Sequence, residues 1–356
     1  SLGAWTAAAR LSENQEPIGT RSAGLFARIR LAIAYARLGW PRKAEAEARK
    51  IIQESLELRR PVLGFYGRNI LAGAQDRMGQ HYMALEITRS VLAAARENHN
   101  PGLVGNVLFV MAATQTQLGR LDDAWETITT LLDNVTQIEF VDIIKLANLL
   151  RGDIFRLLEF YPAAVKNYQD GLGSTLSGIY TLENLLGLGT TLLMQGEGDL
   201  GHHFLERVIN EAQAQELNIY QIEAELVLTY AQILNGEIET AVLRLEPLER
   251  QLAERELTVL PCNPDKLHGL MALQRGDYPA ALALGQTCLN RGLERQNPWL
   301  QLEGLELCLA AAPKEEAANW QRQIEALLNW LDSQTRHAEL RPAFANFQKR
   351  VLERIK

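Results

Sequence analysis

The stretch Leu38-Gly39-Trp40-Pro41-Arg42-Lys43-Ala44 returns along this chain in altered form, and its repetition decides the fold. The copies have their turns at Gly39, Gly79, Gly119, Glu159, Gly196, Gly236 and Gly276, with a weaker eighth turn near Ala312. The first seven turns are separated by steps of 40, 40, 40, 37, 40 and 40 residues. Self-similarity at a nearly fixed period predicts a repeat architecture.

Each copy is predicted to be a helical hairpin. Apolar residues recur at helical spacing before the first turn, as at Leu25, Ile29 and Ile33. The turn glycine ends the first helix because it adopts the left-handed C-cap conformation easily, and a proline such as Pro41 opens the second helix. A small residue precedes each turn residue by seven positions, at Ala32, Ala72, Ala112, Gly152, Gly189, Thr229 and Gly269. Another follows it by five, at Ala44, Ala84, Ala124, Ala164, Gly201, Ala241 and Ala281. Small residues on both helices allow them to pack closely.

This spacing of small residue, glycine and alanine resembles the tetratricopeptide repeat, whose usual period is 34 residues. The resemblance implies an all-α fold, a right-handed superhelix of about eight helical hairpins whose first helices line the concave face. The chain departs from the family in its longer period, in lacking the usual Trp, and in having the next aromatic only at Tyr35 and Phe155. Helices of about 15 to 18 residues would accommodate the longer period.

The repeat length also resembles the sensor region of signal-transducing ATPases related to the bacterial maltose-regulon activator. This resemblance implies a module of a larger ATPase or transcription regulator. The chain begins with Ser1, so we expect an excised piece of a longer protein.

Three segments are expected. Residues 1–19 would form the second helix of a truncated repeat, residues 20–335 the tetratricopeptide-like repeats, and residues 336–356 a C-terminal capping helix. The cap is predicted because Phe344, Phe347 and Val351 recur at helical spacing. The open N-terminal end, which exposes Trp5, is expected to promote self-association.

Composition excludes several classes of function. The hydrophobic fraction is 47% and the formal net charge is −7, which suits a folded chain and disfavours direct nucleic-acid binding. The three cysteines are widely spaced, which indicates a reducing compartment, so a cytoplasmic location is expected. Neither a membrane span nor a secretory signal is apparent.

No residue pattern predicts catalysis, so the chain is not expected to be an enzyme. The sequence Gly196-Glu197-Gly198-Asp199-Leu200-Gly201 matches the dinucleotide-binding GxGxxG, but helices are expected on both sides of it. The histidines lack zinc-binding spacing, so neither a metal nor a cofactor is predicted. Cys262 is the one thiol whose pKa a helix N-terminus could lower, although a structural role is preferred.

The concave groove is the expected binding site, lined by residues thirteen, ten, six and three positions before each turn residue. The candidate residues, chosen where aromatic and polar side chains concentrate, are Tyr66, Asn69, Asp76, Asn106, Phe109, Asp153 and Arg156. The later repeats place Glu183, Glu223, Tyr230, Asn263 and Lys266 at the same positions. Asp153 and Arg156 could alternatively pair only with each other, because they are three residues apart on one helix.

Two functions remain open. The first is a sensor module that binds a protein, a peptide or a small-molecule inducer in the groove and acts on other domains of its parent protein. The second is a scaffold for protein assembly without a small-molecule ligand. A phosphate-loop domain beside this segment would favour the sensor.

Overall fold

The computed structural model describes residues 18–135, 141–173, 179–260 and 262–355. The expected N-terminal segment 1–19, with Trp5, therefore lies almost entirely outside the described residues. The described helices are α2 (Ile18–Arg37), α3 (Pro41–Glu57), α4 (Pro61–Arg77), α5 (His81–Glu97), α6 (Pro101–Gln117), α7 (Leu121–Val135), α8 (Val141–Leu157), α9 (Tyr161–Leu172), α10 (Ile179–Gln195), α11 (Gly198–Ala214), α12 (Asn218–Leu234), α13 (Ile238–Arg255), α14 (Pro264–Gln274), α15 (Tyr278–Glu294), α16 (Pro298–Ala311), α17 (Lys314–Ser333) and α18 (Arg341–Arg354). No strand occurs within these described ranges.

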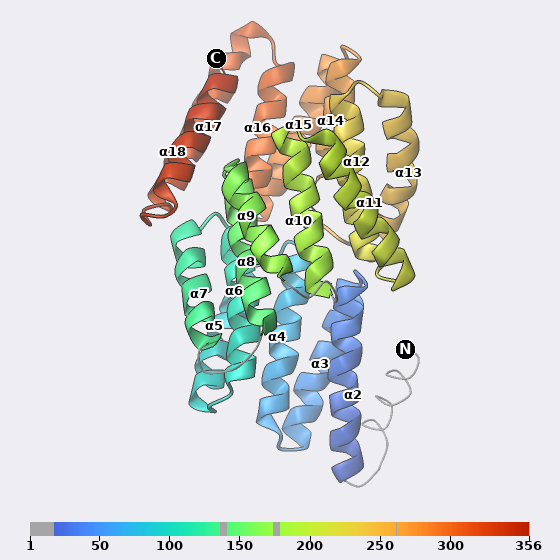
Figure 1. The fold of residues 1–356 in the computed structure, drawn as a ribbon, viewed down its shortest axis with the longest axis vertical. Helices are drawn as coiled ribbons and strands as arrows, with labels where there is room; N and C mark the ends of the chain where they lie inside the picture. The colour runs from blue at the N-terminus through green and yellow to red at the C-terminus, as the bar shows by residue number, and fades with distance from the viewer. Residues whose placement is uncertain (1–17, 136–140, 174–178, 261, 356) are drawn as a thin grey trace.

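Consecutive helices pair into hairpins that stack into a right-handed superhelix, which confirms the predicted fold class (Figure 1). The two small residues of each repeat are buried where its helices meet, as Ala32 and Ala44 are in the first. A Cβ atom added to Gly201 would lie only 2.7 Å from the backbone nitrogen of Leu193. The approach of α10 and α11 is therefore close enough to require glycine there.

Left-handed residues end the helices at both kinds of turn. Within a hairpin the turn residue is usually glycine, as at Gly39 with φ +74°, and Glu159 adopts φ +52° at the fourth turn. Between hairpins the residue is usually not glycine, as at Arg59 and His99, and Gly173 after α9 is an exception. Proline then begins the next helix at Pro61, where its missing N–H removes no helical hydrogen bond.

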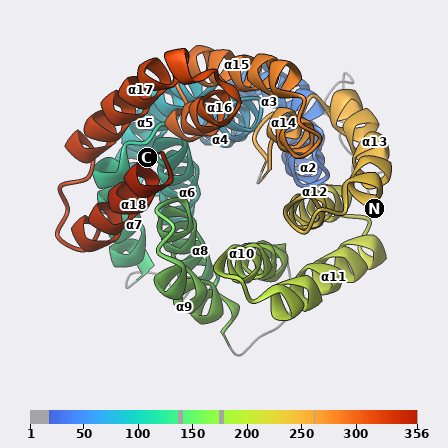
Figure 2. The same cartoon turned by 90° about the horizontal axis from the view of Figure 1, so that it is seen from above.

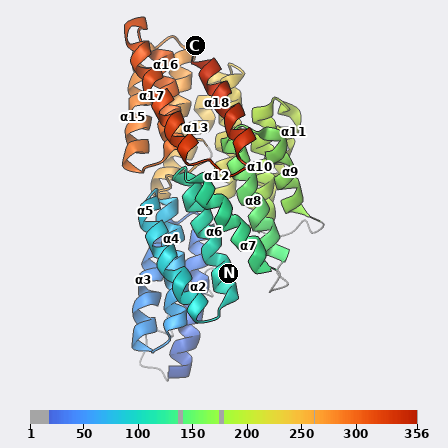
Figure 3. The ribbon, with the colours of Figure 1, turned by 90° about the vertical axis from the view of Figure 1, so that its left-hand side faces the viewer.

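The even-numbered helices line the inside of a ring and the odd-numbered helices cover its outside, as Figure 2 shows along the superhelix axis. The first hairpins lie beneath the last ones, so the chain completes about one superhelical turn and then passes over its own beginning (Figure 3). We call the contact between these two levels the seam.

The seam contains specific polar contacts between residues distant in sequence. Arg42 pairs with Glu256 (Nε to Oε2, 2.7 Å) and Arg77 with Glu223 (Nη1 to Oε1, 2.9 Å). The carboxylate of Asp122 accepts hydrogen bonds from the backbone N–H groups of Arg336 and His337. One hydrophobic core joins α5–α9 to α16 and α18 across the seam. The two levels are therefore packed as one body.

The seam covers the first turns and leaves the later ones exposed. Gly39, Gly79 and Gly119 are buried, whereas Gly196, Gly236 and Gly276 are exposed. A Cβ atom at Gly119 would lie 2.6 Å from Cγ of Pro298, but one at Gly236 would meet nothing within 4 Å.

The last helix, α18, packs on the inner side of α17 and across the seam. Phe344, Phe347 and Val351 are buried, and the rings of Phe347 and Trp299 pack edge to face with centroids 6.2 Å apart. Arg354 donates to both carboxylate oxygens of Glu159 at 2.6 and 2.8 Å. These contacts fix α18 over the turn between α8 and α9.

Candidate functional site

A cavity of about 490 Å³ lies inside the ring on the upper level, and we call it the channel. Its walls come from the inner helices α8, α10, α12, α14 and α16, and its lower rim comes from the seam. Apolar lining is provided by Leu193, Val227, Leu234, Leu270, Trp299 and Phe347. The charged lining consists of Arg156, Glu159, Lys266, Arg295, Glu303, Glu306 and Arg354.

The seven predicted site residues are divided between the two levels. Arg156 lines the channel and contacts Asp153, and Asp76 accepts a hydrogen bond from Nδ1 of His81, which also lines it. The other four lie on α4 and α6 of the lower level and do not line the channel: Tyr66, Asn69, Asn106 and Phe109. Tyr66 and Phe109 pack against the hydrophobic core, and Asn106 is exposed.

Asp153 and Arg156 form a triad with Tyr168 of α9. The Tyr168 hydroxyl donates to Oδ1 of Asp153 at 2.7 Å and accepts from Nε of Arg156 at 3.2 Å. The ion pair itself measures 3.4 Å from Nη2 to Oδ1. Burial, with the charge of Asp153, raises the pKa of Tyr168 well above its usual value, so the hydroxyl remains a donor.

Two glycines leave the space that the Tyr168 ring of this triad occupies. A Cβ atom at Gly152 would lie 2.6 Å from Cε1 of Tyr168, and one at Gly187 would also collide with the ring. Gly152 occupies the repeat position that holds alanine in the first three hairpins. The fourth hairpin therefore has glycine there because Tyr168 packs into the space.

Lys266 of α14 is a positively charged residue in the channel wall beside α16. Its Nζ lies 2.8 Å from Oε1 of Glu303 and 5.2 Å from the ring centroid of Tyr230. Burial lowers the pKa of Lys266, but Glu303 and Tyr230 together raise it above its ordinary value. Lys266 is therefore charged at neutral pH and orients Glu303 along the wall.

A second acidic cluster contains Glu183 of α10 and Glu223 of α12, beside Arg77 of α4. Tyr220 donates to Oε1 of Glu183 at 2.7 Å, while Glu223 pairs with Arg77. Burial raises the pKa of both glutamates, partly opposed by Arg77. Oε2 of Glu183 is buried without a hydrogen-bond partner.

Cys262, Cys288 and Cys308 are free and buried. Burial raises the pKa of Cys262 to about 12 and that of Cys308 to about 11, and it also raises that of Cys288. The expected effect of a helix N-terminus on Cys262 is therefore outweighed by desolvation. Among the described residues no cluster of His, Cys, Asp and Glu could hold a metal ion. No helix in the described ranges is both long and apolar enough to cross a membrane.

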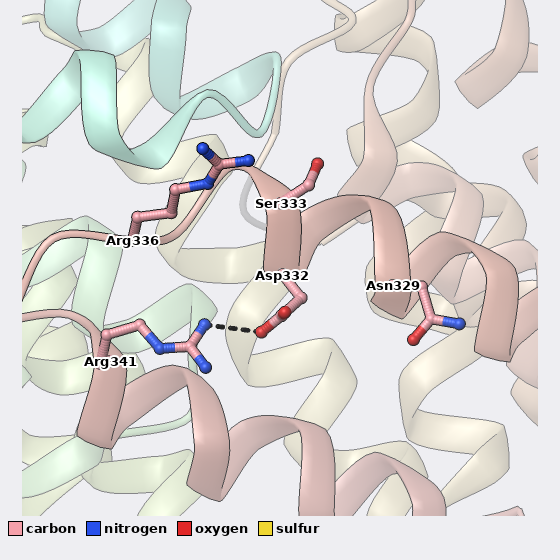
Figure 4. A pocket seen from close by; sticks show the side chains of 5 residues that line it. All are labelled: Asn329, Asp332, Ser333, Arg336 and Arg341. Atoms are coloured by element: carbon pink, nitrogen blue, oxygen red, sulfur yellow. Dashed lines mark hydrogen bonds and ion pairs between the residues drawn. The ribbon is translucent and has the colours of Figure 1, made fainter.

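A second, shallower hollow lies where α17 leads into α18 (Figure 4). Asn329, Asp332, Ser333, Arg336 and Arg341 line it, and Arg341 pairs with Asp332 at 2.6 Å. Both partners are about half exposed, and this pair ties the loop to α17. The channel is therefore the better candidate site.

Sequence reasoning missed part of the channel for an identifiable reason. Tyr230, Asn263 and Lys266 occupy the predicted inward positions, but the choice of candidates favoured the earlier repeats. Arg295 and Thr258 lie outside the helical period, in turns between hairpins, so periodicity gave no signal for them.

No known protein family matches this chain, and no curated protein matches its sequence. Its structure is similar to that of a Rap protein complexed with Competence and Sporulation Factor, with a TM-score of 0.58 and 11% sequence identity. The match covers 93% of this chain and 97% of the Rap protein. A circular tandem repeat protein aligns over 99% of this chain and 94% of its own, at 13% identity and a TM-score of only 0.23. The Rap likeness shows a shared helical-repeat fold.

Proposed function

We propose that this chain is a binding module that takes a short peptide or a small-molecule inducer in the channel. The observation that carries the proposal is the channel itself, a cavity of about 490 Å³ with apolar walls and fixed charged groups. Its volume falls within the range of about 300 to 1,000 Å³ that is common for ligand sites. The residues around it come from both levels of the superhelix, so a ligand there would contact distant parts of the chain.

The Rap protein supports this proposal by its shape. It has the same helical-repeat fold and was solved in complex with Competence and Sporulation Factor. A binding role without catalysis also agrees with the raised pKa of Cys262, which leaves that thiol protonated at neutral pH.

The parent protein, in this proposal, is a bacterial signal-transduction ATPase or transcription regulator for which the chain serves as the cytoplasmic sensor. Occupancy of the channel would bias the parent between inactive and active states. The test is the ATPase or transcriptional activity of the full-length parent with and without a ligand that binds the channel. An unchanged activity at saturating ligand would contradict the sensor role while leaving binding intact.

The alternative function is a scaffold that holds protein partners. It is favoured by large apolar side chains exposed on outer helices, Leu243 on α13 at 74% and Tyr278 on α15 at 55%. A scaffold would bind a folded protein through its outside surface and would not respond to filling of the channel.

The experiment is a thermal-shift screen with arrayed pentapeptides and metabolites, followed by calorimetry on each hit. A ligand at one hundred times its dissociation constant stabilises the folded state by about 2.7 kcal/mol. Ala231 lines the channel, and Ala231→Trp should fill it and abolish binding. The matched control is Ala46→Trp on α3, where the side chain is exposed. Equal binding by Ala231→Trp and the wild type would contradict the channel proposal.

A further inference from the structure

The lower rim of the channel contains a cation that has no acidic partner. Arg295 lines the channel, and its Nη1 donates only to the backbone oxygen of Thr258, at 3.3 Å. No carboxylate in the described part of the chain forms an ion pair with it, whereas Arg156, Lys266 and Arg354 each have one. Among these four channel-lining cations of the described residues, Arg295 is therefore the one without a carboxylate at ion-pairing distance.

The backbone holds Arg295 in place. A Cβ atom at Gly79 would lie 2.8 Å from Cδ of Arg295 and 3.1 Å from Oγ1 of Thr258. The side chain therefore lies directly against the Gly79 turn of the lower level. Burial and the neighbouring Arg291 lower the pKa of Arg295, and the charges of Glu294 and Asp265 only partly oppose this shift.

A second unsatisfied group lies beside the same turn. His81 begins α5 two residues after Gly79, lines the channel and is 1% exposed. Its Nδ1 bonds Oδ1 of Asp76 at 2.8 Å, and its Nε2 is buried without a partner. In the imidazole tautomer that donates from Nδ1–H to Asp76, the lone pair lies on Nε2, which can accept a hydrogen bond.

Two other polar side chains that line the channel, Asn297 and Gln117, are hydrogen-bonded to each other. Asn297 donates to Oε1 of Gln117 at 3.0 Å and accepts from the backbone N–H of Leu300. The site therefore leaves the guanidinium donors of Arg295 and the unpaired Nε2 of His81 for a ligand. The end of a peptide supplies the complementary pair, a carboxylate acceptor and an amide N–H donor.

We propose that the channel binds a short peptide by its C-terminus, with the terminal carboxylate on Arg295 and the last amide N–H directed to Nε2 of His81. This inference rests on the proposed channel function and specifies its ligand class. The carboxylate gains charge-assisted hydrogen bonds from the guanidinium, which are among the strongest in proteins. The rest of the peptide would extend along the apolar wall formed by α12 and α14.

The test uses arrayed pentapeptides without Asp or Glu, so that the terminal carboxylate is their only acidic group. Each hit is resynthesised with a C-terminal amide and titrated against the intact chain by calorimetry. Amidation should weaken binding to the wild type by about tenfold or more. Equal affinities of acid and amide would overturn the carboxylate subsite while leaving the channel function standing. Binding of a metabolite but of no peptide would overturn the peptide proposal alone, and failure of both screens would overturn both proposals.

Substitution of Arg295 tests whether this residue binds the terminal carboxylate. In Arg295→Met the difference between acid and amide should shrink to less than about threefold, because the partner of the carboxylate is gone. Arg291→Met is the matched control, since Arg291 pairs with Asp265 and does not line the channel. A full acid preference in Arg295→Met would refute the assignment. If Arg295→Met does not fold, Arg295→Gln provides the same comparison of peptide acid with peptide amide. The comparison in the wild type does not depend on either variant.

A third arm separates a peptide from a simple carboxylate. The N-acetyl derivative of the C-terminal amino acid of each hit keeps the carboxylate and one amide N–H, but lacks the rest of the chain. It should bind at least about tenfold more weakly than the pentapeptide, because the apolar wall is left uncovered. Binding as tight as that of the pentapeptide would show that the ligand is a small N-acyl carboxylate.

Discussion

The indole N–H of Trp299 donates to the backbone carbonyl oxygen of Thr116 over 2.7 Å, joining residues that are 183 positions apart. Trp299 belongs to the upper level and Thr116 to the last turn of α6 on the lower level. The hydrogen bond is buried and lies beside the channel, which Trp299 also lines. The seam and the candidate site therefore share a side chain.

Trp299→Phe should destabilise the chain by about 1 to 2 kcal/mol, because it removes a buried hydrogen bond and part of an aromatic ring. Urea denaturation followed by circular dichroism measures the change. Tyr278→Phe removes a hydroxyl from a residue that is 55% exposed, and it should leave stability within about 0.5 kcal/mol of the wild type. Equal stabilities of Trp299→Phe and the wild type would mean that this seam contact contributes nothing.

Gly119→Ala and Gly236→Ala compare a covered turn with an exposed one. Both glycines have positive φ, +68° and +81°, so alanine should cost about 1 to 2 kcal/mol at either position. Only at Gly119 does the new methyl group also collide with Pro298. Gly119→Ala should therefore be less stable than Gly236→Ala by a further 1 to 3 kcal/mol or so in the same denaturation assay. Indistinguishable variants would argue against a closed seam.

Glu183→Gln should stabilise the chain near neutral pH. Burial raises the folded-state pKa of Glu183, while the unfolded value is about 4.3, so the folded state holds the proton to higher pH. Stability contributed by the protonated carboxyl is present below the unfolded pKa and is lost as pH rises through the folded pKa. Glutamine keeps an acceptor for Tyr220 without this loss.

The measurement for Glu183→Gln is the melting temperature between pH 4 and pH 8. The advantage of the variant should be largest at the alkaline end and disappear near pH 4, where the wild-type carboxyl is protonated. Glu246→Gln, at a side chain that is 72% exposed, should show no such pH dependence. An advantage of Glu183→Gln that grows toward acid would have the wrong sign.

Phe347→Ala should destabilise the chain by about 3 to 5 kcal/mol, because the ring is 2% exposed and packs against Trp299. Lys349→Ala on the same helix removes a side chain that is 73% exposed and should be nearly neutral. Chemical denaturation of both variants tests whether α18 is part of the cooperative fold. A small effect of Phe347→Ala would mean that α18 can detach without unfolding the rest.

The hairpins followed from the sequence because each is specified locally. One repeat contains the small residues Ala32 and Ala44 and the left-handed turn at Gly39. The same positions recur at the repeat period, so the neighbouring hairpins could be predicted in the same way. The seam could not be predicted from the sequence, because Gly119 and Gly236 occupy equivalent repeat positions and only Gly119 is buried. Which turns are covered depends on a small rotation per repeat, summed over the whole array.

The residues of the candidate site could also be predicted only in part. The inward register placed Arg156 and Lys266 on the concave face, where both line the channel. The same register favoured Asn69 and Asn106, whose helices lie on the other level of the superhelix. Arg295 and Thr258 lie in turns between hairpins, so only the path of the superhelix brings them to the rim.

The burial of Gly39, Gly79 and Gly119 constrains the number of repeats between the two sides of the seam. An open solenoid can gain or lose a unit at the expense of one interface, because each repeat contacts only its neighbours. Here the Gly79 turn meets Arg295 and the Gly119 turn meets Pro298. Insertion of one forty-residue unit between α9 and α12 would displace both partners by a full hairpin. The seam therefore fixes the number of hairpins in this superhelical turn, as the closed rim of a barrel fixes the number of its strands.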